Sequence, residues 1–250
     1  IMAERQADVK KARRRISLDA LRKTAESRVH HDISKMLIGS GTHIIAEMKK
    51  ASPSAGMLRA DYCPAEIARA YKKAGATGIS VLTEPCHFLG CEQHLHEVRR
   101  AVDLPILRKD FICDVYQVYE SAAWGADIIL LIVSALDRNL LHPLYEEALK
   151  CRLNVLIETH TKEELKIALD FKNAIIGINS RNLKTLETNL SIAKKLADGI
   201  PSDRLSIAES GIKTRTDIEE LKKVGYNGFL IGEALMADKS PGRKLHKLTY

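Results

Sequence analysis

The chain of 250 residues lacks any apolar run long enough to cross a membrane. A spanning helix needs about 20 apolar residues, whereas the longest run here, around Ile128–Val133, has the length of a buried strand. The first residues carry charges such as Glu4 and Arg5 and contain no apolar stretch typical of a signal peptide. We therefore expect a cytoplasmic protein with no membrane partner.

The cysteine pattern also lacks a disulfide framework. The cysteines are odd in number, scattered and without a Cys-x-x-Cys pair: Cys63, Cys86, Cys91, Cys113 and Cys151. This pattern favours reduced packing residues. The stretch from Cys86 to His96 could suggest a metal site, but His94 and His96 should diverge on a helix, and the cysteine spacing matches no structural zinc pattern. We predict neither a metal nor a cofactor.

Acidic residues are fewer than basic ones, 32 against 39, so the formal net charge is +7. Much of the excess lies in one early run: Lys10, Lys11, Arg13, Arg14 and Arg15. No aromatic side chains that could stack bases are interleaved with it, which favours a solvated helix face over an RNA-binding patch. We expect no nucleic-acid partner. An RNA-binding barrel is the non-enzymatic alternative, and steeply salt-dependent binding without turnover would support it.

Short runs of β-branched residues are abundant, and each precedes a helix-length amphipathic stretch. Alternating strands and helices predict a parallel sheet, because parallel strands need crossover connections. Eight such units favour an α/β fold closed as a (β/α)8 TIM barrel. The expected strands are His43–Met48, Gly78–Leu82, Pro105–Arg108, Asp127–Ile132, Asn154–Ile157, Ile175–Ile178, Leu205–Ala208 and Gly228–Ile231.

Helix boundary signals accompany these strands. Glu164 is placed for a capping box with Thr161. Residues 1–42 show no strand character, so we predict one barrel domain over 1–250, of which 1–42 is an N-terminal helical extension. The helices with the clearest signals are Leu18–Ser27 after Ser17, Ala65–Ala74 after Pro64, Lys162–Asp170 after Thr161, and one from Thr216 or Asp217 to Val224.

Polar side chains end several of the expected strands, where barrels of this kind build their active sites. The period of two places Glu47 and Lys49 on one face of the first strand, so both can point into the barrel mouth. Any one charge could be a salt bridge at the rim. Charges ending several strands indicate function, because burying them costs free energy. The residues are Glu47, Lys49, Lys109, Glu158, Asn179, Arg181, Glu209 and Ser210.

Small residues form a second group in the loops after the strands. They are Ser52–Gly56 after the first strand, Ser210 and Gly211 after the seventh, and Gly232 after the eighth. Small side chains let backbone N–H groups approach an anion, and the loops after strands seven and eight form the usual phosphate site of this fold. Glycines needed only for tight turns are the alternative explanation.

These residues resemble the indole-3-glycerol phosphate synthase family over nearly the whole chain. The segments that carry the resemblance are Ile45–Gly56, Ser80–Glu84, Pro105–Phe111, Gly177–Leu183 and Ala208–Gly211. The resemblance implies a carboxy-lyase of tryptophan biosynthesis, with an N-terminal extension over the barrel mouth. Its partner would be an anionic sugar phosphate, 1-(2-carboxyphenylamino)-1-deoxyribulose 5-phosphate, and we expect a monomer or weak homo-oligomer. A phosphoribosylanthranilate isomerase is the enzymatic alternative, against which the two lysines argue.

Carried over position by position, the resemblance implies roles for single residues. Lys49, Lys109, Glu47 and Glu158 would form the acid–base set. The sequence does not decide which lysine serves which step; we favour Lys109 as the acid of ring closure, Lys49 for dehydration and Glu158 as the principal base. Each oxygen that becomes a hydroxyl or leaves as water needs a proton donor, and the nitrogen proton needs an acceptor. The remaining implied roles are substrate orientation by Asn179, Arg181 and Glu209; phosphate binding by Ser52, Ser210, Gly211 and Gly232; and an aromatic slot of Phe88, Phe111 and Leu130 or Leu131.

Three positions depart from the family pattern. Ala55 stands where many relatives have lysine, Asn182 replaces a frequent aspartate, and Glu233 follows Gly232 where some relatives have serine. A side-chain phosphate contact is thereby lost at Glu233 and a carboxylate gained. We expect these departures to affect affinity more than reaction type.

Overall fold

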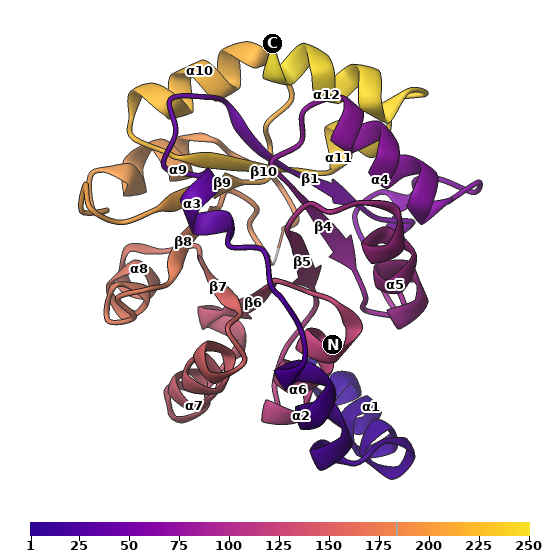
Figure 1. Ribbon diagram of the computed structural model, residues 1–250. Helices are drawn as coiled ribbons and strands as arrows, with labels where there is room; N and C mark the ends of the chain where they lie inside the picture. Colours follow the sequence, from indigo (N-terminus) through magenta and orange to yellow (C-terminus); the bar gives the residue numbers. More distant parts are fainter. Residues whose placement is uncertain (184) are drawn as a thin grey trace.

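A computed structural model describes residues 1–183 and 185–250. Parallel strands close into a barrel in the order β1-β10-β9-β8-β7-β6-β5-β4, and helices surround it (Figure 1). This confirms the predicted (β/α)8 fold. The barrel strands are β1 (His43–Met48), β4 (Gly78–Leu82), β5 (Ile106–Lys109), β6 (Ile128–Ile132), β7 (Asn154–Thr159), β8 (Ile175–Asn179), β9 (Ser206–Glu209) and β10 (Gly228–Ile231).

Helices precede the barrel and connect its strands. A short antiparallel hairpin of β2 (Ala51–Ser52) and β3 (Gly56–Met57), which the sequence did not predict, follows β1. The helices are α1 (Met2–Arg15), α2 (Leu18–Glu26), α3 (Ile33–Met36), α4 (Pro64–Lys73), α5 (Glu92–Ala101), α6 (Val115–Trp124), the 3-10 turn η1 (Val133–Ala135), α7 (Arg138–Lys150), α8 (Lys162–Leu169), α9 (Ser191–Ala197), α10 (Arg215–Lys223), α11 (Glu233–Met236) and α12 (Pro241–Thr249).

Three strands match their predicted bounds, and the other five differ at their ends. Several continue into the polar residues that we expected just beyond them: Leu82 pairs with Lys109, and Asn179 pairs with Glu209. Backbone pairing does not depend on side-chain polarity. A prediction from hydrophobic residues alone therefore ends these strands too early.

The predicted start of α10 is wrong, and the start of α8 is confirmed without its expected capping box. Thr214, rather than Thr216 or Asp217, caps α10, and it forms a capping box with Asp217. Thr161 does cap α8, but Glu164 accepts the N–H of His160 instead of completing the expected box. In both cases the cap lies where a side chain can reach an unpaired N–H group of the first helical turn.

The strand period of two divides the apolar residues into two cores. Side chains such as Ile45, Leu107 and Leu130 fill the barrel, whereas their neighbours face the helices. Helix α3 and the residue after it close the amino end of the barrel with Ile33 and Leu37, which are fully buried. Glycine is required there: a Cβ on Gly78 would lie 3.1 Å from Ile33, and one on Gly228 would lie 2.8 Å from Leu37.

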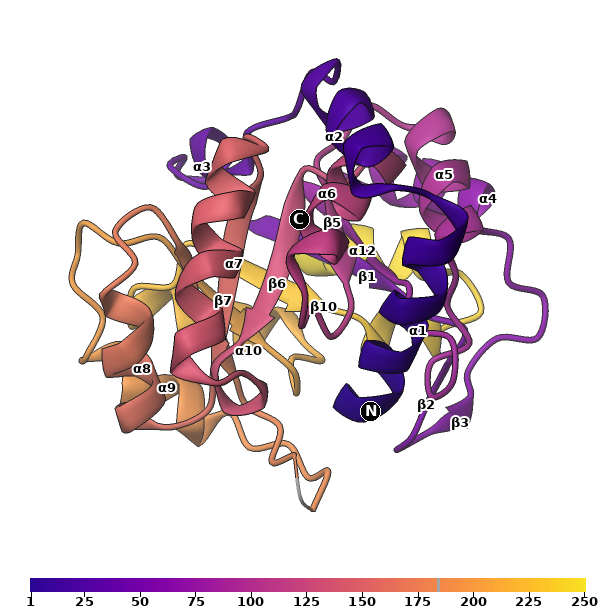
Figure 2. The same cartoon turned by 90° about the horizontal axis from the view of Figure 1, so that it is seen from below.

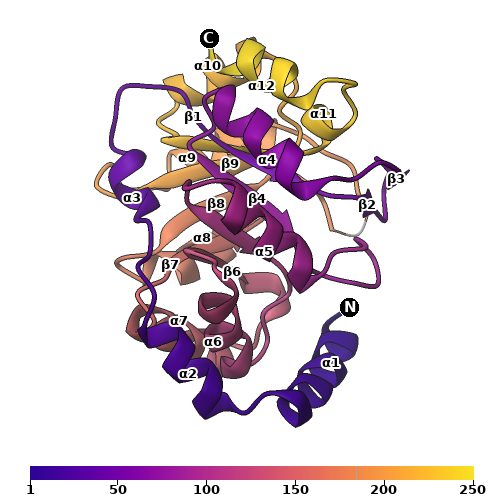
Figure 3. The ribbon, with the colours of Figure 1, turned by 45° about the vertical axis from the view of Figure 1, so that its right-hand side comes forward.

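The first two helices lie on the outside of the barrel next to α6 (Figure 3). Ser17 caps α2, as predicted. The basic run of α1 is exposed, in agreement with a solvated helix face. Arg5 on the other side of α1 is buried and forms two hydrogen bonds, of 2.9 and 2.8 Å, with the carboxylate of Asp110. Within the described residues, no helix is long and apolar enough to span a membrane.

Candidate active site

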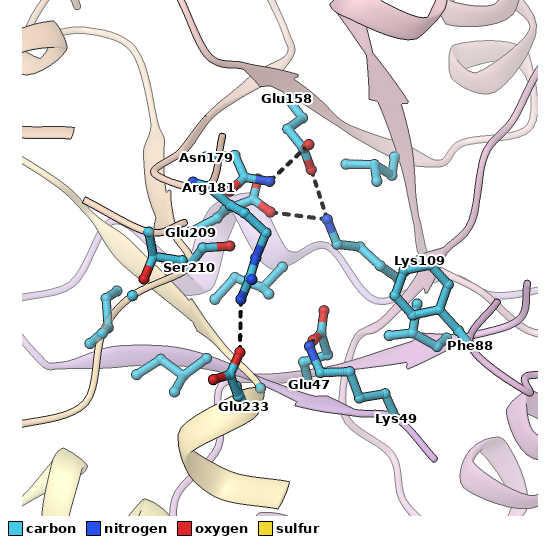
Figure 4. A pocket seen from close by; sticks show the side chains of 18 of the residues that line it. Glu47, Lys49, Phe88, Lys109, Glu158, Asn179, Arg181, Glu209, Ser210 and Glu233 are labelled. Carbon is cyan, nitrogen blue, oxygen red and sulfur yellow. Dashed lines mark hydrogen bonds and ion pairs between the residues drawn. The ribbon is translucent and has the colours of Figure 1, made fainter. Parts of the chain in front are cut away.

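The carboxyl ends of the barrel strands surround a pocket with a volume of about 190 Å³ (Figure 4). All but two of the residues that the sequence singled out line it. They come together because alternate residues of every strand face the barrel interior. Both polar and apolar side chains line the pocket, so it can hold a molecule with one aromatic end and one anionic end.

The two exceptions are Ser52 and Leu131. Ser52 is buried in β2, where its hydroxyl accepts a hydrogen bond from the N–H of Ala55 at 3.2 Å. Leu131 belongs to the core between the barrel and the helices, whereas Leu130 faces the pocket. Of the two leucines considered, the register of β6 therefore selects Leu130.

Lys109 is the centre of the polar wall. Its ammonium nitrogen lies 2.8 Å from Glu158 and 3.1 Å from Glu209, which come from β7 and β9 (Figure 4). The Glu158 and Glu209 side chains are only 3% and 1% exposed, so little water shields their charges. One cation thus bridges two buried carboxylates, and the three groups must titrate together.

The pKa values of this cluster diverge. Burial disfavours the charge of Lys109, but the carboxylates, Glu158 and Glu209 foremost, outweigh it and raise the pKa of Lys109 above its ordinary value. Burial also opposes ionisation of Glu158, yet Lys109 and His160 hold its pKa well below the usual range. Burial and the negative charge of Glu158 raise the pKa of Glu209 to about 7, although Lys109 acts to lower it. Glu209 can therefore exchange a proton near neutral pH.

Glu47 and Lys49 share a face of β1 and its extension, as the period of two predicted. Their charged atoms lie 2.6 Å apart. Gly232 makes this possible, because a Cβ at that position would lie 2.2 Å from the Glu47 carboxylate. In the same way, a Cβ on Gly177 would lie 2.4 Å from Glu209. Both glycines thus make room for carboxylates of the site.

Two residues at the end of β8 extend the polar wall. The Asn179 amide donates to Glu158 at 3.0 Å and accepts from the N–H of Arg181 at 2.9 Å. It therefore fixes the direction of the Glu158 carboxylate. The Arg181 guanidinium donates to the Leu186 carbonyl at 2.8 Å and pairs with Glu233 at 2.8 Å.

Phe88 and Phe111 form the apolar wall with Leu130, and their ring centroids lie 6.4 Å apart. Glu84, fully buried after β4, holds the Phe88 loop by accepting the N–H groups of Cys86, His87 and Phe88. These three backbone donors satisfy its oxygens, which offsets the cost of burying them. The slot is thus fixed by a buried carboxylate that is not itself part of its surface.

The turn after β9 has an uncommon backbone. Ser210 and the following Gly211 both have positive φ, of 64° and 82°. Such a conformation costs a non-glycine residue on the order of 1 kcal/mol and is frequent at functional sites. The turn keeps side-chain bulk away from the pocket, where Gly211 and Gly232 leave backbone accessible.

Sequence reasoning missed four polar residues that organise the site. Glu84 follows β4 and Asp110 follows β5, both within segments that carry the family resemblance. His160 follows Glu158 at the period of two and lies 3.3 Å from it. Glu233 was noted only as a departure. Asp110 contacts the pocket and pairs with Arg5 and Arg108, which together hold its pKa low although burial would raise it. The common signal was a polar residue at a strand end.

The stretch from Cys86 to His96 forms the Phe88 loop and the start of α5. His94 packs edge-on against Tyr62 at 4.9 Å, and His96 pairs with Glu92 at 2.9 Å. Residues 1–183 and 185–250 contain no group of three or more His, Cys, Asp or Glu side chains that could hold a metal ion.

An eight-stranded α/β barrel with paired lysines and glutamates at its mouth defines a barrel enzyme that performs acid–base chemistry. A sequence profile described as indole-3-glycerol phosphate synthase matches residues 1–248. Relatives named indole-3-glycerol phosphate synthase are 43% identical in Burkholderia multivorans and in Burkholderia lata, and 42% in Burkholderia vietnamiensis. Each comparison spans 255 residues and covers 100% of this chain and 97% of the relative.

The chain belongs to the indole-3-glycerol phosphate synthase family. This confirms the predicted family and the predicted activity, that of a carboxy-lyase of tryptophan biosynthesis, over the isomerase alternative. A solved thiamine phosphate pyrophosphorylase from Pyrococcus furiosus shares the fold alone. It is 15% identical, with a TM-score of 0.60, over 83% of this chain and 93% of that one.

Proposed function

We propose that this pocket converts 1-(2-carboxyphenylamino)-1-deoxyribulose 5-phosphate into indole-3-glycerol phosphate with its own side chains as acids and bases. The observation that carries the proposal is the Lys109 ammonium, held between Glu158 and Glu209 beside an aromatic slot. Ring closure joins the ring carbon that bears the carboxylate to the sugar ketone carbon. Carbon dioxide then leaves, and the new hydroxyl departs as water.

Lys109 is the acid of ring closure in this proposal. The ketone oxygen gains negative charge as its carbon is attacked and needs a proton. The surrounding carboxylates keep Lys109 charged, so a proton is always available at this position. Lys49, which pairs with Glu47 at the end of β1, would serve the departing hydroxyl.

The predicted role of Glu158 as principal base stays a prediction. The pKa values favour two separate roles, one for Glu158 and one for Glu209. A carboxylate whose pKa is held very low keeps its charge but accepts protons poorly. Glu158 suits the role of a fixed counter-ion to Lys109, and Asn179 orients it. Glu209, with a pKa raised to about 7, suits the acceptor of the proton released as the ring becomes aromatic.

The two ends of the substrate fit the two walls. We place the aromatic ring between Phe88 and Phe111, where apolar surroundings favour loss of the carboxylate. We place the phosphate at Ser210, Gly211 and Gly232, where small residues expose backbone. Holding both ends brings ring and ketone together, and such an effect can supply about 7–11 kcal/mol at best.

We also propose that residues 1–250 act as one domain, in which 1–42 extends the barrel. Ile33 and Leu37 complete its amino end, and Arg5 reaches Asp110 beside the pocket. We propose a monomer or weak homo-oligomer that works in a reducing, cytoplasmic compartment without a nucleic-acid partner. The free thiols of Cys63, Cys86 and Cys91, all exposed, suit that compartment.

One experiment tests the proposed function. The purified protein is mixed with the carboxyphenylamino substrate in excess EDTA, without nucleotide, and indole fluorescence is followed. We expect turnover at the same rate with and without EDTA, since each proposed catalytic group is a side chain. Absence of turnover would reject the proposed substrate, and activity restored by a divalent ion would reject catalysis by side chains alone.

A further inference from the structure

Three basic side chains that line the pocket are paired with carboxylates, whereas a fourth, Lys213, has no ion pair among the described residues. Lys49 pairs with Glu47, and Lys109 pairs with Glu158 and Glu209. The third pair, Arg181 with Glu233, joins the end of β8 to the residue after Gly232 (Figure 4). An anionic substrate must therefore compete with a carboxylate for any of these three cations.

The three pairs differ in how easily they open. The Glu47, Glu158 and Glu209 side chains are 6%, 3% and 1% exposed, whereas that of Glu233 is 46% exposed. Breaking a buried pair leaves a charge without water or partner, which is costly. A half-exposed carboxylate that leaves its partner is hydrated at once, so its pair is weak. The Arg181–Glu233 pair is thus the one that an entering anion can open.

Arg181 is also held so that it can change partners without moving away. One of its terminal nitrogens donates to the Leu186 carbonyl at 2.8 Å and lies 3.4 Å from the Ser54 hydroxyl. The other terminal nitrogen carries the bond to Glu233. When Glu233 leaves, the first nitrogen keeps the guanidinium in place and the second faces the pocket.

We propose that Glu233 is an internal competitor for the substrate phosphate, which displaces it from Arg181 on binding. The carboxylate pairs with one nitrogen of Arg181 and sets the affinity for phosphate without taking part in the chemistry. This proposal rests on the phosphate position proposed above, at Ser210, Gly211 and Gly232. It makes Glu233 a determinant of affinity for the anionic end of the substrate.

The test measures competitive inhibition by inorganic phosphate in Glu233→Gln. We expect the inhibition constant for phosphate to fall about fivefold or more, the scale for removing a like charge a few ångströms from an anion at a wet site. The substrate KM should fall by a larger factor than kcat changes. Anthranilate, which carries the carboxylate but no phosphate, should inhibit the variant and the parent protein alike.

Two controls sharpen this result. Glu219→Gln removes the same charge from an exposed glutamate that pairs with Arg215 at 3.2 Å on α10, outside the pocket, and should leave phosphate inhibition unchanged. In an Arg181→Gln background, the gain from Glu233→Gln should shrink, because no guanidinium is left to release. An equal gain in phosphate inhibition with and without Arg181 would show that Glu233 only repels phosphate. That result would overturn the proposed exchange of partners at Arg181.

Failure of this inference and failure of the proposed phosphate position give different results. If Glu233→Gln leaves phosphate inhibition unchanged or weakens it, while Gly211→Asp weakens it, the phosphate position stands and the competitor role of Glu233 is wrong. If neither variant alters phosphate inhibition, phosphate binds elsewhere and both are wrong. If Glu233→Gln tightens anthranilate instead, Arg181 receives the substrate carboxylate and the exchange proposed for phosphate is overturned.

Discussion

At the amino end of the barrel the strands close around apolar side chains, whereas at the carboxyl end they surround charged ones. Figure 2 shows the two ends, with α3 on one side and the N-terminus and the β2–β3 hairpin on the other. Ile33 and Leu37 fill the amino end without any polar atom of their side chains to satisfy. The charges at that end, such as Asp127, are paired: it bonds Arg99 at 2.8 Å and the N–H groups of His31 and Ile106.

At the carboxyl end, charged groups share their partners. One oxygen of Glu209 is buried without a hydrogen-bond partner among the described residues, and Lys109 must neutralise two carboxylates. Buried groups of this kind cost stability and are retained where function needs their shifted pKa values. The comparison indicates that one end of the barrel supplies folding free energy and the other uses part of it to hold reactive groups.

The strongest test of this division replaces the central cation of the carboxyl end. Lys109→Met removes the proposed acid, so indole formation and carbon dioxide release should both fall by roughly 10²-fold or more. Lys49→Met is the matched variant. It should still release carbon dioxide while a hydroxylated, decarboxylated intermediate accumulates. Both are measured in single turnovers at saturating substrate, to separate chemistry from binding.

Carbon dioxide release at the parent rate in Lys109→Met would contradict its role in ring closure. Circular dichroism should show the parent fold for both lysine variants, because neither change removes a side chain of the apolar core. Thermal unfolding of the same samples distinguishes a lost acid from a lost fold.

The second test is made at the amino end. Leu37→Ala opens a cavity in a fully buried position and should lower the free energy of unfolding by about 3 kcal/mol. Denaturant titration measures this loss, and kcat should be retained because the pocket lies at the other end. Ile38→Ala, at a neighbouring side chain that is 72% exposed, should cost less than about 0.5 kcal/mol. A large loss of kcat in folded Leu37→Ala would show that the ends are not independent.

A third test concerns the phosphate turn at the carboxyl end. Gly211→Asp places a carboxylate where the dianion is proposed to bind, and KM should rise about tenfold or more. Gly211→Asn is the matched control, since its side chain has nearly the same shape and tolerates positive φ but carries no charge. Similar KM values in the two variants would mean that strain at this φ of 82°, rather than charge, explains the effect.

The smallest effect is expected in the pH dependence of stability. The pKa of Glu209 rises from 4.5 to about 7 on folding, so the folded state binds the proton more tightly than the unfolded state. Its contribution to stability is therefore present below about pH 4.5 and is lost as pH rises towards 7. Glu209→Gln should remove this part of the dependence of the unfolding free energy on pH, as measured by denaturant titrations at several pH values. Identical slopes for variant and parent would reject the raised pKa.

Much of the site could be predicted because it follows from local pattern. The strands, their alternation with helices and the polar residues at their ends can be predicted from patterns of neighbouring residues along the chain. Glu47 and Lys49 are an example, since their shared face needs only the strand period. The resemblance added roles that spacing cannot supply. Local reasoning did not foresee that Ser52 lies outside the pocket, because the hairpin that buries it has no hydrophobic signal of its own.

The sequence by itself determined which residues form strands and which of them end in chemically useful side chains, because these features depend on neighbours along the chain. Only the tertiary structure decided that Leu130 rather than Leu131 faces the pocket, since that depends on the register of β6 against its neighbours. It also decided that Lys109 bridges Glu158 and Glu209, which lie 49 and 100 residues away in sequence. Closure of the barrel creates those contacts, and with them the shifted pKa values, because charges interact through space and not along the chain.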